Sequence, residues 1–260
     1  MSQSGRLEIR NVSKKYEVEG RTSVQVLDRA SLTVEAGEFV SIVGPSGCGK
    51  STLLRLIVGL DDEYEGDILL HGDRIAGTSL ARGIVFQDHR LLPWLTLERN
   101  VALSVQNSTL NPAQQAQTVH DHISLVGLGG FGQAYPHQLS GGMAQRAAIA
   151  RGLASRPEIL LLDEPLGALD ALTRIRLQQE LLRIWRVEGV TMILVTHDVD
   201  EAIYLSNRVV VMNANPGRIV RQIEIDLPAP RDRASHAFVS IKRDILAAMG
   251  EYAGLEQEAA

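Results

Sequence analysis

The chain has 260 residues, a formal net charge of −5 at pH 7 and 45% hydrophobic residues. This composition is ordinary for a soluble globular protein, and the length allows one large domain or two smaller ones. The negative charge argues against broad nucleic-acid binding, because phosphate backbones attract basic surfaces. A single cysteine, Cys48, excludes an intramolecular disulfide and fits a reducing compartment.

Two alternating stretches open the chain. Residues Leu7 to Tyr16 and Val24 to Val34 alternate apolar and polar side chains around a charged turn near Glu19-Gly20-Arg21. This alternation predicts antiparallel strands with one face in solvent. Two roles are open for Tyr16 at the end of the first strand: stacking on a purine ring, or filling an ordinary half-buried position.

A glycine-rich loop follows the apolar run Phe39 to Val43 and precedes the helical segment Leu53 to Ile57. The loop consists of Gly44, Pro45, Ser46, Gly47, Cys48, Gly49, Lys50, Ser51 and Thr52. A strand, a glycine loop and a helix in this order predict a phosphate-binding loop, because inward-pointing N–H groups and the helix start attract anions. We expect Lys50 to reach the β and γ phosphates and Ser51 to place its hydroxyl on Mg²⁺. The alternatives are a glycine turn that fits by chance and, for Cys48, a redox sensor instead of a small loop residue.

The strand pattern continues in Gly66 to Gly72 and in Gly83 to Phe86, which delivers Gln87 at its end. From about residue 88 to 156 the apolar spacing becomes helical. The residues that recur on one face of each segment are Leu97, Val101 and Val105, and then Val119, Ile123 and Val126. This change predicts a helical subdomain inserted into an α/β core.

The second predicted helix of this subdomain opens at Asn111-Pro112, where an asparagine cap precedes a proline in the first turn. Its His120 and His122 are two positions apart and face different sides of the helix. They make a poor metal site, and we expect both in solvent.

Ser140, Gly141 and Gly142 stand directly before Met143 to Leu153, a stretch rich in good helix formers. Free N–H groups and the positive end of a helix meet there, which makes these residues a second candidate anion site. An ordinary capped helix accounts for the same residues equally well.

The apolar run Ile159 to Leu162 ends in two carboxylates, Asp163 and Glu164. A run that is apolar on both faces predicts a central parallel strand, and such strands bind ligands at their carboxyl ends. We expect Asp163 to hold Mg²⁺ through water and Glu164 to orient or deprotonate the water that attacks the γ phosphate. The alternative is a strand that merely ends in surface acids.

After a turn that contains Asp170, residues 173–187 predict a helix, and 191–196 predict the next central strand. His197 stands at the carboxyl end of this strand. It can donate a hydrogen bond to the γ phosphate, or it can serve as a cap for the helix expected at 198–205.

Residues 208–213 and 218–225 predict two further strands. From residue 228 the chain is charged and contains one amphipathic helix. We expect the last residues of the chain, Glu256 to Ala260, to be frayed. The apolar positions of this helix are Phe238, Ile241, Ile245 and Met249.

The order and spacing of these motifs resemble the ATP-binding subunit of an ABC transporter across Leu7 to Ile225. The resemblance implies an α/β fold, a P-loop NTPase (ABC ATPase) core with an antiparallel β subdomain and a helical subdomain inserted at about 88–156. The ATPase domain would span 1–227, and 228–260 would be a C-terminal tail.

The resemblance assigns a role to each motif. Gly44 to Thr52 matches the Walker A loop, Ile159 to Asp163 matches Walker B, and Glu164 matches the catalytic glutamate. Gln87 matches the Q-loop residue that senses Mg²⁺ and the attacking water, and His197 matches the switch histidine.

Three further matches concern contacts to the nucleotide. Residues Leu139 to Met143 fall on the family's signature, Asp170 falls on the D-loop, and Tyr16 falls on the adenine-stacking aromatic. The signature usually ends in glutamine where this chain has Met143. Methionine donates no hydrogen bond, so a ribose contact is in doubt, but the serine and the N–H groups are intact and we expect ATP hydrolysis to survive.

The resemblance also implies ATP and Mg²⁺ as cofactors, with Ser51, Gln87 and Asp163 near the metal. Two copies would pair head to tail, each lending Ser140 and Gly142 to the ATP on the other's Lys50. Hydrolysis would remove the shared γ phosphate and loosen the dimer, so that attached membrane subunits switch their access. Catalysis would rest on positioning and charge stabilisation.

A finer resemblance concerns the cargo. Residues 87–94 and 164–174 are similar to importers for nitrate, taurine and aliphatic sulfonates, among which the aliphatic-sulfonate importers are our first choice. The implied partners are a second copy, two transmembrane permease subunits and a periplasmic or surface solute-binding protein, with no nucleic acid. The apolar Leu91 to Trp94 segment predicts either a socket for a permease helix or simple subdomain core.

The chain start, Met1 to Arg6, lacks the apolar stretch of a secretory signal, and no run of about eighteen apolar residues occurs. With the implied partners, this predicts a peripheral protein at the cytoplasmic face of the cell (inner) membrane.

Two rival classes share parts of the pattern. Soluble ABC ATPases of DNA repair or translation tend to carry two ATP modules, zinc cysteines or long coiled coils, which this chain lacks. P-loop kinases and GTPases need neither a second anion loop like Ser140 to Gly142 nor a histidine such as His197 at a strand end.

Overall fold

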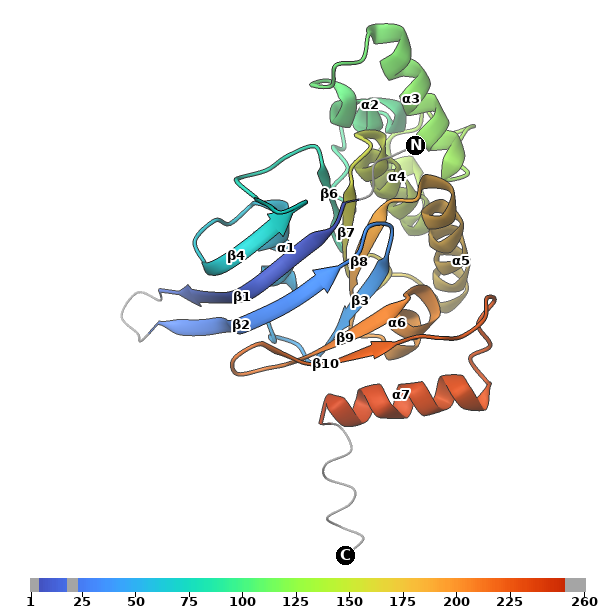
Figure 1. Ribbon diagram of the computed structural model, residues 1–260. Coiled ribbons are helices and arrows are strands. Elements are labelled where there is room, and N and C mark those ends of the chain that lie inside the picture. Colours follow the sequence, from blue (N-terminus) through green and yellow to red (C-terminus); the bar gives the residue numbers. More distant parts are fainter. Residues whose placement is uncertain (1–4, 18–22, 251–260) are drawn as a thin grey trace, which may run out of the picture. The chain divides into compact units, whose positions relative to one another are not determined.

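The computed structural model describes residues 5–17 and 23–250. By its contacts the chain divides into two compact units (Figure 1): the terminal unit, residues 5–78 and 193–250, and the middle unit, residues 79–192. The predicted turn at Glu19 to Arg21 and the last residues, Glu256 to Ala260, lie outside the described residues. The predicted boundaries of the helical subdomain and of the tail stay predictions.

The terminal unit contains an antiparallel sheet with the strand order β2-β1-β4-β5. The strands are β1 (Leu7–Tyr16), β2 (Val24–Val34), β4 (Glu65–Leu70) and β5 (Asp73–Arg74). In β1, Leu7 pairs with Val34 on one side and with Leu70 on the other. Because the chain alternates inward apolar and outward polar residues here, the two strands predicted from that alternation are confirmed with their bounds.

The same unit contains strands of a second sheet in the order β10-β9-β3-β8, of which β8 begins just before the boundary of the unit. They are β3 (Phe39–Val43), β8 (Thr191–Val195), β9 (Arg208–Asn213) and β10 (Arg218–Glu224). β3 and β9 run parallel, with Ile42 opposite Val210, whereas β10 is antiparallel to β9. All residues of β3 and β8 are buried, as expected for parallel strands covered on both faces.

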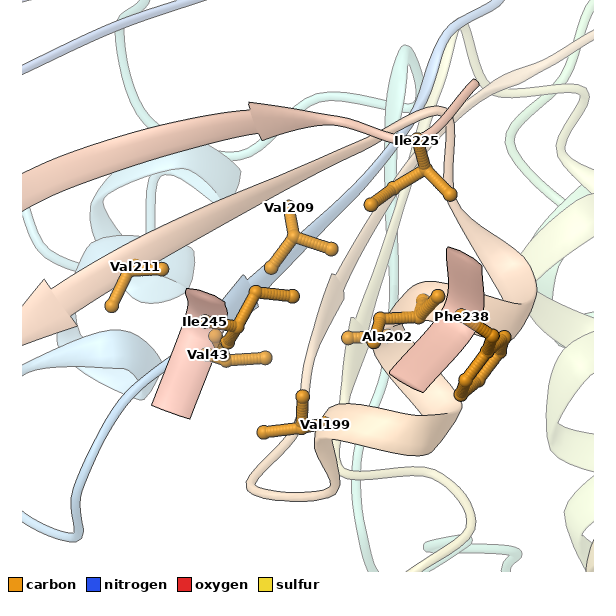
Figure 2. Packing of buried hydrophobic residues seen from close by; sticks show 9 residues of the cluster. Val43, Val199, Ala202, Val209, Val211, Ile225, Phe238 and Ile245 are labelled. Carbon is orange, nitrogen blue, oxygen red and sulfur yellow. The ribbon is translucent and has the colours of Figure 1, made fainter. Parts of the chain in front are cut away.

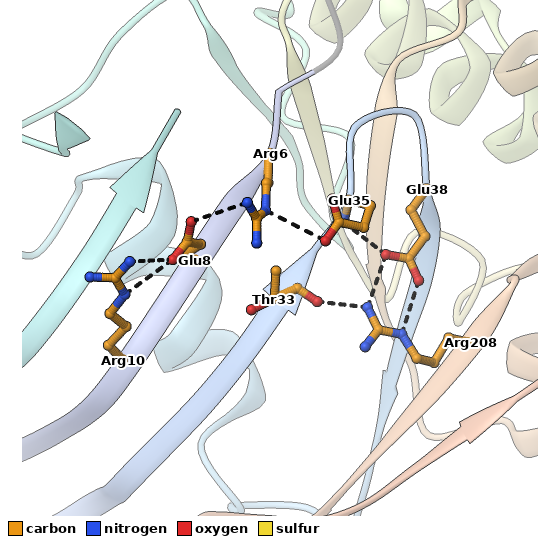
Figure 3. Close-up of polar contacts among 7 residues, drawn as sticks. All are labelled: Arg6, Glu8, Arg10, Thr33, Glu35, Glu38 and Arg208. Atoms are coloured by element: carbon orange, nitrogen blue, oxygen red, sulfur yellow. Dashed lines mark hydrogen bonds and ion pairs between the residues drawn. The ribbon is translucent and has the colours of Figure 1, made fainter. Parts of the chain in front are cut away.

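Charged side chains tie the start of this buried sheet to β2. The Arg208 guanidinium donates from Nε and Nη2 to the two carboxylate oxygens of Glu38, at 2.9 Å each, and from Nη2 to the Thr33 carbonyl oxygen at 2.6 Å. Figure 3 shows this fork beside a more exposed chain of ion pairs formed by Arg6, Glu8, Arg10 and Glu35. The bidentate geometry fixes the start of β9 against the β2–β3 turn.

Three helices complete the terminal unit: α1 (Lys50–Val58), α6 (Val199–Leu205) and α7 (His236–Ala248). α7 is the amphipathic helix expected in the tail, and its Phe238 and Ile245 are completely buried. Figure 2 shows these two side chains among residues of β3, α6, β9 and the end of β10. The helix is therefore part of the hydrophobic core of this unit.

The middle unit combines a parallel strand pair with a set of helices. β6 (Arg82–Val85) pairs with β7 (Ile159–Asp163), with Gly83 opposite Leu160. The helices are α2 (Leu97–Ala102), η1 (Leu103–Val105), α3 (Pro112–Leu125), η2 (Pro136–Gln138), α4 (Gly141–Ala154) and α5 (Ala171–Glu188). None of the helices in residues 5–17 and 23–250 is long and apolar enough to cross a membrane.

The helical periodicities predicted for this unit are confirmed. The apolar positions named for the two faces are buried, and Asn111 caps α3 through a capping box with Gln114. The expectation for His122 is wrong, because its side chain is only 5% exposed and Nδ1 lies 2.7 Å from the Thr118 carbonyl oxygen. His122 follows Thr118 by four residues and shares its buried face, whereas His120 is exposed.

Candidate functional site

The glycine-rich loop connects β3 to α1 in the terminal unit. Gly47 and Gly49 have φ angles of 80° and 91°, in the left-handed region that favours glycine. A Cβ at Gly44 would lie 2.4 Å from the Met212 carbonyl oxygen, so no larger residue fits there. The N-cap of α1 is Gly49, without a side-chain cap, which leaves the N–H groups of the first turn to a ligand.

Lys50 lies inside this loop and is only 7% exposed. Its ammonium donates to the carbonyl oxygens of Gly44, at 2.8 Å, and Pro45, at 3.1 Å, with the Cys48 Sγ at 3.8 Å. Burial raises the pKa of the Cys48 thiol even though Lys50 opposes the shift. A buried, protonated thiol is unreactive, which favours the role of a small loop residue over that of a redox sensor.

Tyr16 is half-buried at the end of β1, and its hydroxyl donates to Asp61 Oδ2 at 3.0 Å. Lys14 Nζ lies 2.7 Å from Asp61 Oδ1 and 4.7 Å from the centre of the tyrosine ring. Burial and Asp61 raise the pKa of Tyr16, whereas Lys14 and a hydrogen bond with Thr52 act in the opposite direction. The structure thus brings Tyr16 next to the last residue of the phosphate loop.

His197 is exposed directly after β8. The N-cap of α6 is Asp198, whose side chain accepts from the Glu201 N–H at 3.0 Å. The capping role considered for His197 therefore belongs to its neighbour.

In the middle unit, Asp163 ends β7 and is half-buried, as is Glu164. Glu164 has a φ angle of 47°, which is strained for a residue with a side chain, and such strain occurs often at functional sites. A Cβ placed on Gly167 would lie 3.5 Å from Gln87 Nε2 and 3.8 Å from Glu164 Oε2. The structure thus brings two predicted site residues, Gln87 and Glu164, to the same turn.

Ser140 is the N-cap of α4, and its hydroxyl oxygen accepts from the Met143 N–H at 3.3 Å. A serine that accepts in this way keeps its own proton for donation. Ser140 and Gly141 are exposed, whereas Gly142 packs closely: a Cβ there would lie 2.5 Å from Thr173 Cγ2. Ser140 thus caps this helix start, and the anion site predicted there stays a prediction.

Asp170 is exposed and caps α5, accepting from the N–H groups of Leu172, at 3.1 Å, and Thr173, at 3.0 Å. Hydrogen bonds from the Thr173 side chain and backbone hold the pKa of Asp170 below its usual value. The carboxylate is therefore ionised at neutral pH and already serves as a structural acceptor.

Two residues of α4 that the sequence did not single out reach the segment around Gln87. Arg151 donates to the carbonyl oxygens of Arg90, at 2.7 Å, and His89, at 2.9 Å, and Gln145 donates to Phe86 at 3.3 Å. The available signal was that these polar residues interrupt an alanine-rich helix. They tie the helix that starts after Ser140 to the segment that follows β6.

The apolar segment after Gln87 splits into a buried and an exposed part. Leu91 is 6% exposed, whereas the Trp94 side chain is 69% exposed. Leu91 is thus subdomain core, and Trp94 offers an aromatic surface.

The predicted Mg²⁺ ligands, the Ser51 hydroxyl and the Asp163 carboxylate, are too few to hold a cation without further oxygen ligands from a bound phosphate or water. The described residues contain no group of three or more His, Cys, Asp or Glu side chains that could hold a metal ion. Ser51, in the first turn of α1, and Asp163 are half-buried. Mg²⁺ commonly takes one or two protein oxygens and completes its shell with phosphates and water, so the Ser51 hydroxyl and the Asp163 carboxylate are each a suitable type of ligand.

The comparisons with known proteins agree with this arrangement. A family model described as ABC transporter matches residues 27–167. The aliphatic sulfonates import ATP-binding protein of Bacillus cereus is 51% identical over 238 residues, covering 92% of this chain and 93% of that protein. The protein of the same description from Bacillus subtilis is 46% identical, with 94% of each chain covered. An ABC transporter ATP-binding protein of Methanocaldococcus jannaschii is 49% identical, covering 93% and 90%.

Two solved structures are similar to the whole arrangement. A dimeric, post-hydrolysis ATP-binding cassette with ADP and phosphate bound has a TM-score of 0.72 at 31% identity, covering 84% of this chain and 98% of the other. A dimeric bacterial ABC transporter cassette has a TM-score of 0.74 at 33% identity with the same coverage. The predicted α/β P-loop fold is confirmed, and the chain belongs to the ABC transporter family as one of its ATP-hydrolysing cassettes.

Proposed function

We propose that this chain hydrolyses ATP to energise an import complex for aliphatic sulfonates. One structural observation carries the ATPase: a phosphate loop closed around the buried Lys50 at the uncapped start of α1. The cargo rests on the relatives of Bacillus cereus and Bacillus subtilis, which carry that description and are covered almost completely. Nitrate or taurine import is the second candidate, from the likeness of residues 87–94 to those importers.

ATP takes its phosphate contacts from the loop and its adenine contact from Tyr16. Lys50 neutralises charge on the β and γ phosphates, and the N–H groups at the start of α1 bind the phosphate oxygens. The loop residues that contribute are Gly44, Pro45, Ser46, Gly47, Cys48, Gly49, Lys50, Ser51 and Thr52. The Lys50 ammonium donates to the Gly44 and Pro45 carbonyl oxygens in this structure, and charged phosphate oxygens are stronger acceptors that would replace them.

Hydrolysis requires a positioned water and a neutralised γ phosphate. Bound Mg²⁺ would supply charge neutralisation, held by Ser51 directly and by Asp163 through water, with Gln87 beside it. Glu164 accepts a proton from the attacking water or orients it, and His197 donates a hydrogen bond to the γ phosphate. The strained backbone of Glu164 and the closeness of Gln87 to the same turn support the roles proposed for Glu164 and Gln87.

The exposed groups of the middle unit meet the nucleotide of a second copy. Ser140, Gly141 and Gly142 offer a hydroxyl and a helix start to the γ phosphate held by the partner, and Asp170 lies at the same interface. The dimeric state of both similar solved cassettes supports this pairing. Met143 contributes no ribose hydrogen bond, and we expect hydrolysis to tolerate that.

The complex contains two permease subunits and receives cargo from a periplasmic or surface solute-binding protein. Trp94, exposed next to the Gln87 segment, contacts a permease helix. The chain is then a peripheral subunit at the cytoplasmic face of the inner membrane. A soluble ABC ATPase of DNA repair or translation is the remaining alternative, and purification with ribosomes or DNA in place of a permease would favour it.

A complementation experiment tests the function. A strain that lacks the gene should fail to grow on an aliphatic sulfonate as the sole sulfur source and should grow normally on sulfate. The parent chain should restore growth, and Glu164→Gln should not, although the purified variant should bind ATP and accumulate as an ATP-bound dimer. We expect its phosphate release to fall by about 100-fold or more, because the water loses its proton acceptor.

Two results would contradict this proposal separately. Growth of the deleted strain on sulfonates, but not on nitrate or taurine, would move the cargo to that second candidate. Normal phosphate release by Glu164→Gln would remove this residue from the reaction, whatever the cargo is.

A further inference from the structure

The segment after β10 lies outside the region that the family model matches. It nevertheless packs on β3 and α6, the elements of the terminal unit that lead into the phosphate loop and follow His197. α7 contributes Phe238 and Ile245, both completely buried, to a cluster that includes Val43 and Ala202 (Figure 2). Val43 is the last residue of β3 and directly precedes Gly44 of the phosphate loop. One helix thus packs against both the base of the loop and α6.

A polar contact holds the other end of α6. Arg231 Nη1 donates to the carbonyl oxygens of Ile203, at 2.6 Å, and Ser206, at 2.7 Å, and Nη2 donates to that of Ile225 at 3.3 Å. These include carbonyls left without partners at a helix end, and a cation is favourable there. Because the guanidinium is planar, its several bonds fix the direction of α6 as well as its place.

An ion pair joins α7 to the first turn of α6. Lys242 Nζ lies 2.7 Å from Asp200 Oδ2, with the two side chains 39% and 41% exposed. Exposed pairs of this kind contribute little to stability, so its effect is one of orientation. Arg231 and Lys242 therefore hold α6 at its two ends.

The start of α6 is coupled rigidly to His197. Thr196 and Glu201 are both almost completely buried, and the Thr196 hydroxyl donates to the Glu201 carboxylate. The same hydroxyl oxygen accepts from the Asp198 N–H at 3.0 Å, and Asp198 caps the helix. The residues before and after His197 are thus bonded to α6, so a displacement of the helix moves the histidine.

We propose that Arg231, Phe238, Lys242 and Ile245, together the C-terminal brace, position His197 for its contact with the γ phosphate. This inference rests on the role proposed for His197. The brace anchors α6 to the strand that carries the phosphate loop, so the loop and the histidine keep a fixed separation within the terminal unit. These residues touch no substrate and act through α6.

The test compares steady-state ATP hydrolysis of the full-length parent with Arg231→Gln. We expect kcat to fall about tenfold with the KM for ATP unchanged within about twofold, because a small misplacement of a group that acts on the γ phosphate costs rate more than binding. Arg243→Gln is the matched control, since Arg243 is an exposed arginine on α7, and it should keep the parent's kcat.

A double-mutant cycle separates positioning from general damage. In a His197→Ala background, Arg231→Gln should cause no further loss of kcat, because the residue to be positioned is gone. An equal loss in both backgrounds, or a rise in KM that accounts for the loss, would overturn the brace. If His197→Ala alone keeps the parent's kcat, the proposed role of His197 fails. If His197→Ala is impaired but Arg231→Gln is normal, the role of His197 stands and the brace fails.

A milder variant keeps the test decisive if Arg231→Gln loses its thermal unfolding transition. Lys242→Met should lower kcat about threefold with an unchanged melting temperature, and Lys242→Arg should restore it, because an exposed ion pair affects stability by little. A normal kcat in Lys242→Met, together with the unfolding of Arg231→Gln, would show that the segment only stabilises the fold and would exclude the proposal.

Discussion

The phosphate loop of the terminal unit and the exposed site residues of the middle unit are held in opposite ways. In the terminal unit, Lys50 is 7% exposed and bonded to its own loop, and a Cβ on Gly44 or Gly49 would clash with neighbouring atoms. In the middle unit, Gln87, Ser140 and Asp170 are exposed at helix starts and turns. The phosphate loop is hydrogen-bonded within itself, whereas these three residues of the middle unit are exposed to solvent.

This difference fits a site completed by other molecules. A loop that holds its lysine on its own carbonyl groups and leaves its first-turn N–H groups without a side-chain cap is preorganised, and it binds phosphate without a large rearrangement. Exposed caps can acquire partners only from outside the chain, as the proposed second copy and permease would provide. Substitutions in the terminal unit should therefore act within the protomer, and those in the middle unit should act on assembly.

Three substitutions test this difference. The first, with the largest expected effect of the three, asks whether the exposed helix start of α4 also depends on close packing. Gly142→Ala places a methyl group 2.5 Å from Thr173 Cγ2, and overpacking of this kind costs about 2 kcal/mol unless the start of α4 shifts to relieve it. A shifted helix start should weaken ATP-dependent dimerisation by up to about 30-fold, which is the same free energy written as an equilibrium ratio. The loss should come from the clash, because alanine is the better helix former. ATP-dependent dimerisation and phosphate release would be measured side by side.

The double variant Gly142→Ala/Thr173→Ser removes the clashing methyl group and keeps the hydroxyl that bonds Asp170. It should recover most of the loss, and Thr173→Ser alone should behave as the parent. An unrescued double variant would mean that Gly142 is needed for close approach of the phosphate and not for packing against α5.

A smaller effect concerns the terminal unit. Burial raises the pKa of Asp61, but hydrogen bonds from Lys14 and Tyr16 outweigh it, and the pKa lies below its ordinary value. A carboxyl with a lowered pKa stabilises the fold above its unfolded-state pKa and loses that contribution as the pH falls through its folded-state pKa. Asp61→Asn should therefore be about 1 kcal/mol less stable than the parent at neutral pH, because it loses charge-assisted hydrogen bonds.

Urea unfolding at neutral and at acidic pH would measure this gap. The difference between parent and Asp61→Asn should begin to shrink as the pH falls below the ordinary aspartate pKa of about 3.9, and it should close only below the lowered folded-state pKa of Asp61. Asp62→Asn is the control, since Asp62 is its exposed neighbour and should show no gap at either pH. A gap that does not change with pH would assign the effect to side-chain shape and not to charge.

The smallest effect on the isolated chain should come from Trp94. Trp94→Ala should leave ATP hydrolysis by the purified protein within about twofold of the parent, since exposed substitutions rarely perturb the fold. It should reduce recovery of the permease in a pull-down of the complex, whereas Phe131→Ala, at another exposed aromatic residue of the same unit, should not. Normal assembly by Trp94→Ala would exclude the docking role.

Much of the fold could be predicted because its signals are local. Strands β1 and β2 follow from alternation, α3 follows from Asn111 and the 3.6-residue period, and Gly189 ends α5 in the left-handed conformation. The phosphate loop was predicted for the same reason, since its conformation depends on residues adjacent in sequence.

The remainder depends on contacts between distant segments, which no local pattern encodes. The burial of His122 depends on which side of α3 meets other helices, and the place of α7 depends on an apolar surface shared by β3 and α6. The strained φ angle of Glu164 is imposed by the turn into which β7 runs. Arg151 bonds to carbonyls more than sixty positions away in sequence, and its place in an alanine-rich helix does not reveal these partners.

The grip of Arg151 on two successive carbonyls has one more consequence. The planar guanidinium makes two hydrogen bonds and so fixes the orientation of the segment it contacts, whereas the ammonium of a lysine would not fix it. The contact links the segment that leads to the exposed Trp94 with the helix that Ser140 caps, within the middle unit.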